Sequence, residues 1–460
     1  MLTSVSIENF KAWKNTGKIH LAPLTVIFGA NSAGKSSLGH LLLALKQTAI
    51  STDRQRALHL GDENTFIDLG TFKECIFNHD LSNPLNFCLE WQLPTGFNVK
   101  DPLHKKKYQG DSLKLAVSLL AGKTEQPEVT ELRFDLGRKQ EEILDVRYLR
   151  KESGKFDLQS ESYKFVRSSG RVWPLNKPEK FYRISEQSRA RFQNAGFLSD
   201  FALSTEKILS KFFYLGPLRD YPKRIYQWSG ESPEGVGHKG EYVISSILAA
   251  QSLKRRFNRG PRMRTYDFEE FIARWLKDLG MIHSFSVKPV AKGRKEYEVL
   301  VTTHSAAPEV KITDVGFGVS QVLPVLVEAF YCPPGSIVWM EQPEIHLHPQ
   351  VQTGLADLFI SAIQARENGK PRNVQMIIES HSEHFLNRLQ RRIAEEKISP
   401  QDVAVYFCKR SGGSTELEPL RINLFGDIEN WPDQFFGDEM EELTARTVAA
   451  ARRRQKENNK

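Results

Sequence analysis

A glycine-rich segment near the start of the chain has the residue types and spacing of a phosphate-binding loop, G-x-x-x-x-G-K-S. Its residues are Gly29, Ala30, Asn31, Ser32, Ala33, Gly34, Lys35 and Ser36, with Ser37 following. The glycines allow backbone N–H groups to curl around phosphate oxygens. A helix that follows such a loop presents its positive N-terminal end to the anion. We therefore expect Lys35 to contact the β- and γ-phosphates of a nucleotide and the Ser36 hydroxyl to bind Mg²⁺.

Two carboxylates follow an apolar run at 337–340. Glu341 comes directly after this run and is the predicted metal-side carboxylate. Glu344, three positions on, either activates the attacking water or serves as a hydrogen-bonding or capping residue. His346 and His348 have alternate spacing that suits a turn, and no third His or Cys lies nearby in sequence, which argues against a separate metal site.

Two further segments have residues suited to phosphate chemistry. The glycine-rich segment Asp314–Gln321 precedes an apolar stretch, so Gly318 and Ser320 lie near the predicted start of a helix. Because one nucleotide needs only one phosphate loop, we expect this second segment to contact a nucleotide held by another subunit. His381 follows an apolar strand ending at Ile378, where it can contact a γ-phosphate or polarise the attacking water.

These residues require an α/β framework to bring them together. Short apolar runs at 24–28, 337–340, 374–378 and 403–407 read as buried strands, and the stretches that follow the first three read as helices. The predicted fold class is α/β, with a mostly parallel sheet and helices on both sides. We expect an ATPase core from 1–60 and 300–410, an inserted β and helical lobe over 61–299, and a small C-terminal domain with a charged tail over 411–460.

Composition excludes several classes of protein. The 460 residues are 40% hydrophobic and 26% charged, which is ordinary for a globular protein. No apolar run is long enough to span a membrane and no secretory signal is visible, so we expect a cytoplasmic protein without membrane contact. The net charge of +8 permits an acidic partner. The basic segment, residues 254–264, has Phe257 among six basic residues, and it is either a contact for DNA or an acidic protein or a solvated surface.

The order of these motifs resembles the ABC-type ATPase heads of the RecF, SMC and OLD families. More closely, the chain resembles stand-alone bacterial ATPases of this group that end in a small domain of unknown function. The matching segments are Ile7–Lys11, Tyr214–Arg219, Gly316–Pro324, Glu341–Pro349 and Ser380–Phe385, with Gly426–Ile428 and Trp431–Pro432 in the C-terminal domain. The resemblance implies ATP and Mg²⁺ as cofactors and a homo-oligomer whose ATP sites are completed between subunits.

The function implied by this resemblance is a regulatory ATPase. The group includes ATPase subunits of phage-defence systems, notably PARIS, in which a separate TOPRIM-like nuclease acts beside the ATPase. We expect no nuclease in this chain, because only about 55 residues follow the last core strand. The alternatives are a RecF-like ATPase of DNA repair or recombination and an assembly scaffold with little turnover. The scaffold is suggested by Gln342, because related heads place a catalytic Glu there and a carboxamide is not a general base.

Overall fold

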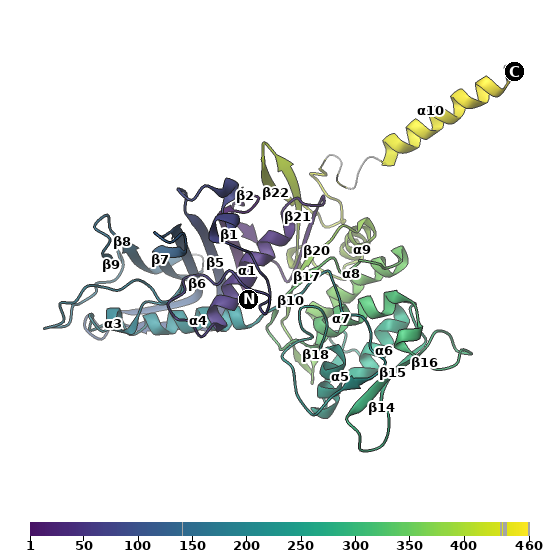
Figure 1. Cartoon of the computed structure of the whole chain (residues 1–460), viewed down its shortest axis with the longest axis horizontal. Helices are drawn as coiled ribbons and strands as arrows, with labels where there is room; N and C mark the ends of the chain where they lie inside the picture. Colours follow the sequence, from purple (N-terminus) through teal and green to yellow (C-terminus); the bar gives the residue numbers. More distant parts are fainter. Residues whose placement is uncertain (140, 433–434, 436–438, 459–460) are drawn as a thin grey trace.

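The computed structural model has two halves, one built around an antiparallel sheet and the other around a smaller, mostly parallel sheet (Figure 1). The structure describes residues 1–139, 141–432, 435 and 439–458, and within these ranges the strands form four sheets. The first helix, α1 (Lys35–Ile50), lies where the two halves meet, so the helix that follows the glycine-rich loop belongs to both.

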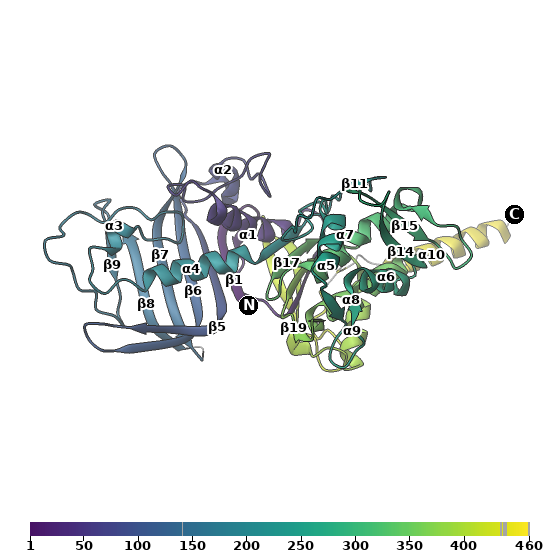
Figure 2. The same cartoon turned by 90° about the horizontal axis from the view of Figure 1, so that it is seen from below.

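The largest sheet in the described part of the chain is eight-stranded and antiparallel, in the order β2-β1-β5-β6-β7-β8-β9 with β3 paired to β1. Its long strands alternate between buried and more exposed residues, which is typical of a sheet with one covered face. The helix α4 (Leu198–Ser210) crosses that face (Figure 2). The strands are β1 (Leu2–Phe10), β2 (Trp13–Asn15), β3 (Ile19–His20), β5 (Leu85–Lys100), β6 (Lys107–Ala121), β7 (Pro127–Arg138), β8 (Glu141–Arg150) and β9 (Phe156–Gln159).

The second sheet, six-stranded over the described residues, carries the glycine-rich loop. Its first five strands run parallel, and the last strand pairs antiparallel with its neighbour. Every residue of β4, β17 and β20 is buried, because helices cover both faces. In spatial order the strands are β10 (Phe212–Leu215), β17 (Ile337–Glu341), β20 (Gln375–Glu379), β4 (Leu24–Gly29), β21 (Val403–Ser411) and β22 (Ser414–Leu420).

This parallel sheet separates two hydrophobic cores. Ile27, Trp339 and Ile377 face the core shared with α1 and the antiparallel sheet. The residues that alternate with these along each strand, such as Val26 and Met340, face the other core. The helices of that second core are α5 (Val243–Ser252), α6 (Phe268–Asp278), α7 (Phe317–Tyr331), α8 (Pro349–Gln364) and α9 (Glu383–Ala394).

Smaller elements complete the fold. Two further sheets consist of β11 (Tyr226–Gln227), β14 (Ser284–Pro289), β15 (Glu296–Thr302) and β16 (Val310–Lys311), and of β12 (Arg256–Asn258), β13 (Tyr266–Asp267), β18 (Arg366–Glu367) and β19 (Lys370–Pro371). The remaining helices are α2 (Phe72–Cys75), α3 (Glu186–Arg189), α10 (Glu439–Asn458) and the 3₁₀ turns Phe77–His79, Ile312–Asp314 and Pro400–Asp402. Among the described residues, no helix is both long and apolar enough to cross a membrane.

Two expectations from the sequence differ from this architecture. A mostly parallel sheet is not confirmed for the molecule as a whole, because the largest sheet is antiparallel and the parallel strands are confined to the six-stranded sheet. The stretch 61–299 does not pack as one inserted lobe. Strands β5 to β9 extend the sheet begun by β1, whereas α5 and α6 pack with α7 in the second core. Its two parts therefore complete different halves of the molecule.

Candidate active site

The glycine-rich loop lies between β4 and α1, as the sequence predicted. Ser32 and Gly34 adopt left-handed backbone angles (φ 58° and 89°), which turn the chain sharply before the helix begins at Lys35. The Lys35 ammonium lies inside the loop and donates hydrogen bonds to the carbonyls of Gly29 and Ala30, both at 2.9 Å. Burial lowers the pKa of Lys35, and the carboxylates of the site partly offset that effect. The loop therefore holds a buried cation at the N-terminus of a helix, which suits a phosphate group.

Side chains from distant parts of the sequence hold the loop in place. The indole Nε1 of Trp13 donates to the carbonyl of Gly34 at 3.1 Å and to the Ser37 hydroxyl at 3.0 Å. Arg410, on β21, donates to the carbonyl of Ser32 at 2.8 Å. At Gly29 a Cβ atom would lie 2.5 Å from the Cys408 carbonyl oxygen, so only glycine allows β4 and β21 to approach this closely.

Glu341 and Glu379 end neighbouring parallel strands, β17 and β20, in direct register. The Ser36 hydroxyl donates to Glu379 Oε1 at 2.8 Å, so the residue predicted to bind Mg²⁺ contacts a carboxylate that the sequence analysis left without a role. Glu341 Oε1 accepts a hydrogen bond from the Tyr214 hydroxyl at 2.9 Å, and His40 Nε2 lies 3.6 Å from the same oxygen. Burial and the nearby Glu341 raise the pKa of Glu379.

Glu344 and His381 meet at the same edge of the sheet. Glu344 Oε1 accepts a hydrogen bond from the backbone N–H of His381 at 2.5 Å. Burial raises the pKa of the Glu344 carboxyl, which makes it a better proton acceptor than an ordinary glutamate. Burial and the charge of Lys35 lower the pKa of His381 to about 4, so its imidazole is neutral at pH 7.

Within the described residues, the buried polar atoms at this edge that have no hydrogen-bond partner include Glu344 Oε2, Glu379 Oε2 and His381 Nε2. Unpartnered buried polar atoms are costly, so their gathering beside Lys35 indicates a site that takes a polar ligand. Among the described residues no group of three or more His, Cys, Asp or Glu side chains could hold a metal ion. Mg²⁺ in nucleotide sites usually has one or two protein carboxylates and substrate phosphates as ligands, so Ser36 with Glu341 or Glu379 fits that ion.

The residues around Gln342 form a strained turn. Gln342 and His346 have positive φ angles of 44° and 60°, which are uncommon for residues other than glycine. Arg219 steadies this turn by donating to the carbonyl of Glu341 at 3.2 Å. The His346 ring lies edge-on to Phe317, and His348 caps the start of α8, so each histidine has a structural contact.

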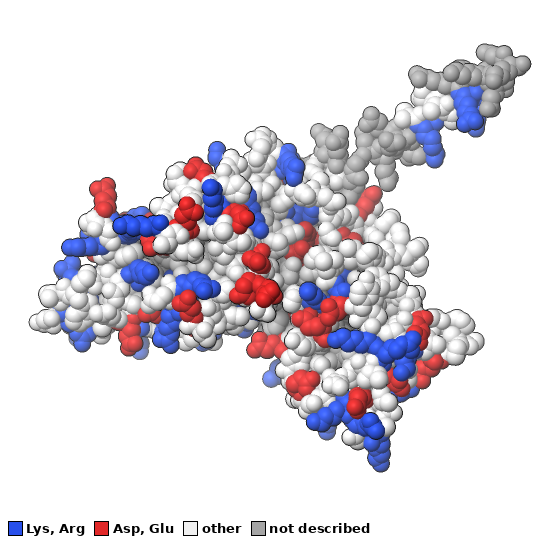
Figure 3. Space-filling model, viewed as in Figure 1, with Lys and Arg blue, Asp and Glu red and all other residues white. Residues whose placement is uncertain are grey.

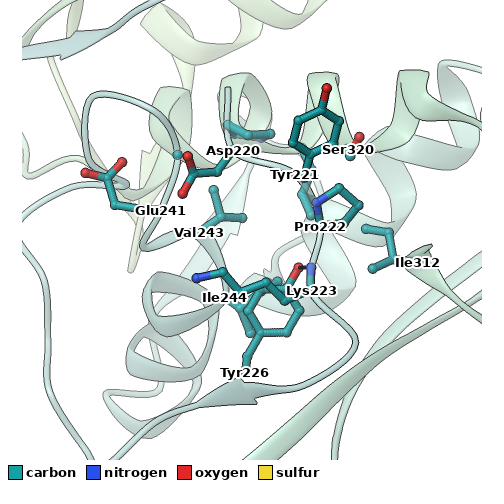
Figure 4. Close-up of a pocket in the computed structure, with 13 residues that line it drawn as sticks. Asp220, Tyr221, Pro222, Lys223, Tyr226, Glu241, Val243, Ile244, Ile312 and Ser320 are labelled. Carbon is teal, nitrogen blue, oxygen red and sulfur yellow. Dashed lines mark hydrogen bonds between the residues drawn. The ribbon is translucent and has the colours of Figure 1, made fainter. Parts of the chain in front are cut away.

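The segment with Gly318 and Ser320 begins α7 and lies in the second half of the molecule. The Ser320 hydroxyl donates to the carbonyl of Phe317 at 2.7 Å, and Ser320 is only 7% exposed. Ser320 and Tyr221 line a cavity of about 40 Å³ (Figure 4). Within the described part of the chain, the nearest neighbours of a Cβ atom at Gly318 would be Met281, Leu347 and His346. These neighbours are not residues of the phosphate loop.

The basic segment is largely engaged with the rest of the chain. Arg255 forms an ion pair with Glu367, Arg256 with Asp267, and Arg259 with Asp278, at 2.6 to 3.3 Å. Arg259 also lies 3.9 Å from the centre of the Trp275 ring. On the face of the molecule shown in Figure 3, basic and acidic side chains are interspersed. These contacts favour the interpretation of the segment as a structural surface.

Several residues of the site have no role in the sequence analysis. Glu379 is the residue for which the sequence contains a signal, because an acid at the carboxyl end of a predicted parallel strand faces the same edge as the phosphate loop. Tyr214 and Arg219 belong to a segment that resembles the ATPase heads, but their contacts with Glu341 become visible only in the fold. Trp13 and Arg410 reach the loop through strand pairing and have no local sequence signal.

The fold and the site define a P-loop nucleotide-binding protein. The chain belongs to the AAA ATPase domain family, which matches residues 1–188 and 250–386, more than half of the chain. Residues 398–445 match a second family, described as a protein of unknown function (DUF3696). No curated protein matches the chain in sequence.

Solved structures similar to this chain include heads of SMC proteins. One is an SMC head bound to the C-winged helix domain of ScpA, with a TM-score of 0.40 and 10% identity over 92% of this chain and 98% of that one. The others are the SMC head domain from Thermotoga maritima (0.39, 10%, covering 92% and 99%) and a Pyrococcus furiosus Smc head with an extended coiled coil, bound to the C-terminal domain of ScpA (0.39, 11%, covering 91% and 96%).

Proposed function

We propose that the protein binds ATP with Mg²⁺, hydrolyses it slowly, and uses its nucleotide state to control a separate effector protein. The observation that carries the proposal is the group of unpartnered buried atoms on Glu344, Glu379 and His381 beside the Lys35 ammonium. Such a set of charged and polar groups at the N-terminus of a helix suits a triphosphate better than any apolar ligand.

Each residue of the site has a definite task in this proposal. Lys35 and the N-terminus of α1 bind the β- and γ-phosphates. Ser36 and Glu341 hold Mg²⁺, which supplies positive charge that offsets the charge of the phosphates. Glu344 accepts the proton of the attacking water, since its Oε1 is oriented by the His381 backbone and its Oε2 is unpartnered. The neutral His381 imidazole orients the water or the γ-phosphate.

The identity of Gln342 supports slow turnover. The Gln342 carboxamide, directly after Glu341, cannot accept a proton at neutral pH. Glu344, two residues further along the turn, therefore accepts the proton of the attacking water. A second candidate, a scaffold that binds ATP to assemble and hardly hydrolyses it, is favoured by the same residue. The two functions differ in the rate of phosphate release from a protein that binds ATP normally.

We further propose that the effector is a TOPRIM-like nuclease in antiviral defence and that the ATPase acts as a homo-oligomer. This part rests on the resemblance to the phage-defence ATPases. A RecF-like role in DNA repair receives less support, because three arginines of the basic segment are paired with acids of the same chain. DNA-stimulated hydrolysis would distinguish that role.

The test of nucleotide binding compares the wild-type protein with Lys35→Ala by isothermal titration calorimetry with ATP, in Mg²⁺ and in EDTA. We expect Lys35→Ala to abolish binding or productive turnover, because backbone amides alone do not offset the phosphate charge. Lys277→Ala, at an exposed position on α6, is the matched control. Unchanged ATP affinity and unchanged turnover in Lys35→Ala would refute the site.

A further inference from the structure

A cleft of about 560 Å³ lies beside the glycine-rich loop. It is separate from the edge of the sheet where Glu341 and Glu379 lie. The loop residues Ala30 and Asn31 line one part of it, and Lys409 and Arg410 of β21 line another. Trp431 and Pro432, from the C-terminal segment, also line it. A cleft of this size is in the range of small-molecule sites.

The strand order determines the direction in which a bound nucleotide extends. Strand β4 lies between β20 and β21. The carboxylates that belong at the γ-phosphate, Glu341 and Glu379, end β17 and β20 on one side of β4. The opposite end of the nucleotide, with its ribose and base, therefore extends toward β21. The cleft lies on that side, where Cys408 of β21 is in register with Gly29.

An aromatic ring forms part of the cleft wall. Trp431 is 50% exposed, and its ring packs edge-on against Phe435 with 5.1 Å between the ring centres. Phe435 in turn contacts Phe407 of β21 and Phe28 of β4, at 4.7 and 5.6 Å between ring centres. Through Phe435 the indole therefore packs against β4 and β21, and half of the Trp431 surface remains exposed to contact a ligand.

The polar groups of the cleft suit a nucleoside. Arg410 bonds to the Ser32 carbonyl and brings a positive charge close to the loop. Lys409 is 2.9 Å from Glu418, which also lines the cleft, and Asn31 is exposed. An exposed aromatic face with a few polar side chains is the usual arrangement for binding a base by stacking.

We propose that this cleft binds the base of the nucleotide and that Trp431 stacks on it. The inference rests on the proposed ATP binding and assigns a role to the C-terminal family segment, 398–445, which contains β21, β22 and Trp431. That segment completes the nucleotide site of its own chain, whereas the phosphates are bound by residues of the AAA segment.

The test separates the base from the phosphates. ATP and inorganic tripolyphosphate, each with Mg²⁺, are titrated calorimetrically into the wild-type protein, Trp431→Ala and Trp431→Phe. We expect Trp431→Ala to bind ATP about ten-fold or more weakly, because it loses the stacking surface, and to bind tripolyphosphate as the wild type does. Trp431→Phe retains most of the ATP affinity. Phe425→Ala, an exposed aromatic of the same segment outside the cleft, is the control.

Each contrary outcome has a distinct meaning. Equal ATP affinity in the wild type and Trp431→Ala would overturn the stacking role. Equal losses for ATP and tripolyphosphate would also overturn it, since the variant would then have damaged the phosphate loop. A wild-type protein that binds neither ligand would refute the proposed ATP binding itself.

Discussion

At the scale of single residues, the site combines three buried carboxylates with the Lys35 ammonium. Each of these carboxylates raises the pKa of Lys35, because a nearby negative charge favours the charged ammonium; they are Glu341, Glu344 and Glu379. Adding a triphosphate to this set brings further negative charge, which a divalent cation can offset. We therefore attribute separate tasks to the carboxylates, with metal binding at the strand ends and proton transfer at the turn.

The first residue prediction concerns Glu344. Glu344→Gln keeps the size of the side chain and its hydrogen bond from His381, but it removes the proton acceptor. We expect ATP affinity to change less than two-fold and hydrolysis to slow about 100-fold or more. Phosphate release and calorimetric binding measure the two effects. Hydrolysis at the wild-type rate would show that the base is another group.

The second residue prediction concerns Glu341. Glu341→Gln removes the charge that we propose faces Mg²⁺ and leaves an oxygen for the Tyr214 hydroxyl, so the fold is expected to persist. We expect Mg²⁺-dependent ATP affinity to fall about ten-fold or more, with little change in EDTA. Glu396→Gln, at an exposed position after α9, is the control. A larger loss in Glu379→Gln than in Glu341→Gln would identify Glu379 as the principal metal ligand.

At the scale of elements, α7 carries a buried acid that links stability to pH. Glu328 is 1% exposed and accepts a hydrogen bond from the backbone N–H of Val236 at 2.7 Å. Burial raises its pKa from 4.5 to about 7. Because the folded-state pKa is the higher one, the protonated acid's contribution to stability is complete below pH 4.5 and is lost as pH rises through 7.

Glu328→Gln is expected to remove this pH dependence. The loss in the wild type is on the order of 3 kcal/mol in the free energy of unfolding, because burial outweighs the nearby charges of Lys46 and Arg372, which favour the charged form. Urea unfolding of both proteins at pH 5 and pH 8 measures it. The wild type should lose more stability than Glu328→Gln over this range, and identical losses would contradict the assignment.

The elements that hold the phosphate loop were predictable because their signals are local. The run at 337–340 is fully apolar, and the run at 24–28 has Thr25 as its one polar residue. A polar or glycine residue follows each run, and the structure has β4 and β17 there. Pairing of β1 with β5 joins residues about 80 positions apart, and no local pattern specifies it. The contact between Ser36 and Glu379 likewise depends on the order of strands in the sheet, which no local sequence pattern specifies.

At the scale of the whole molecule, the segment that begins α7 belongs to a partly apolar surface. Leu218, Tyr221 and Phe317 are 77%, 76% and 41% exposed, and the rings of Tyr221 and Phe317 are 5.6 Å apart. Large exposed aromatic groups of this kind often mark contact sites between proteins. From the resemblance of its motifs to ABC-type heads, we propose that the partner is a second copy and that this segment contacts the partner's nucleotide.

Gly316 offers a substitution that tests the contact without disturbing the fold. Gly316 is exposed and has an ordinary φ of −57°, and no atom of the described part of the chain lies within 4 Å of a Cβ placed there. Gly316→Glu places a negative charge where a partner's phosphates would lie, whereas Gly316→Ala adds only a methyl group. We expect Gly316→Glu to bind ATP normally but to lose ATP-dependent association and most hydrolysis, and Gly316→Ala to behave as the wild type.

Mixing variants then tests whether sites are shared. Lys35→Ala subunits lack a working phosphate loop but keep an intact α7 segment, and Gly316→Glu subunits have the reverse. In a mixed pair, one composite site combines an intact loop with an intact segment, so hydrolysis should recover to part of the wild-type rate although each variant alone is inactive. Light scattering with and without ATP measures association in parallel. A wild-type protein that hydrolyses ATP at full specific rate as a monomer at high dilution would contradict shared sites, because each subunit would then carry a complete site of its own.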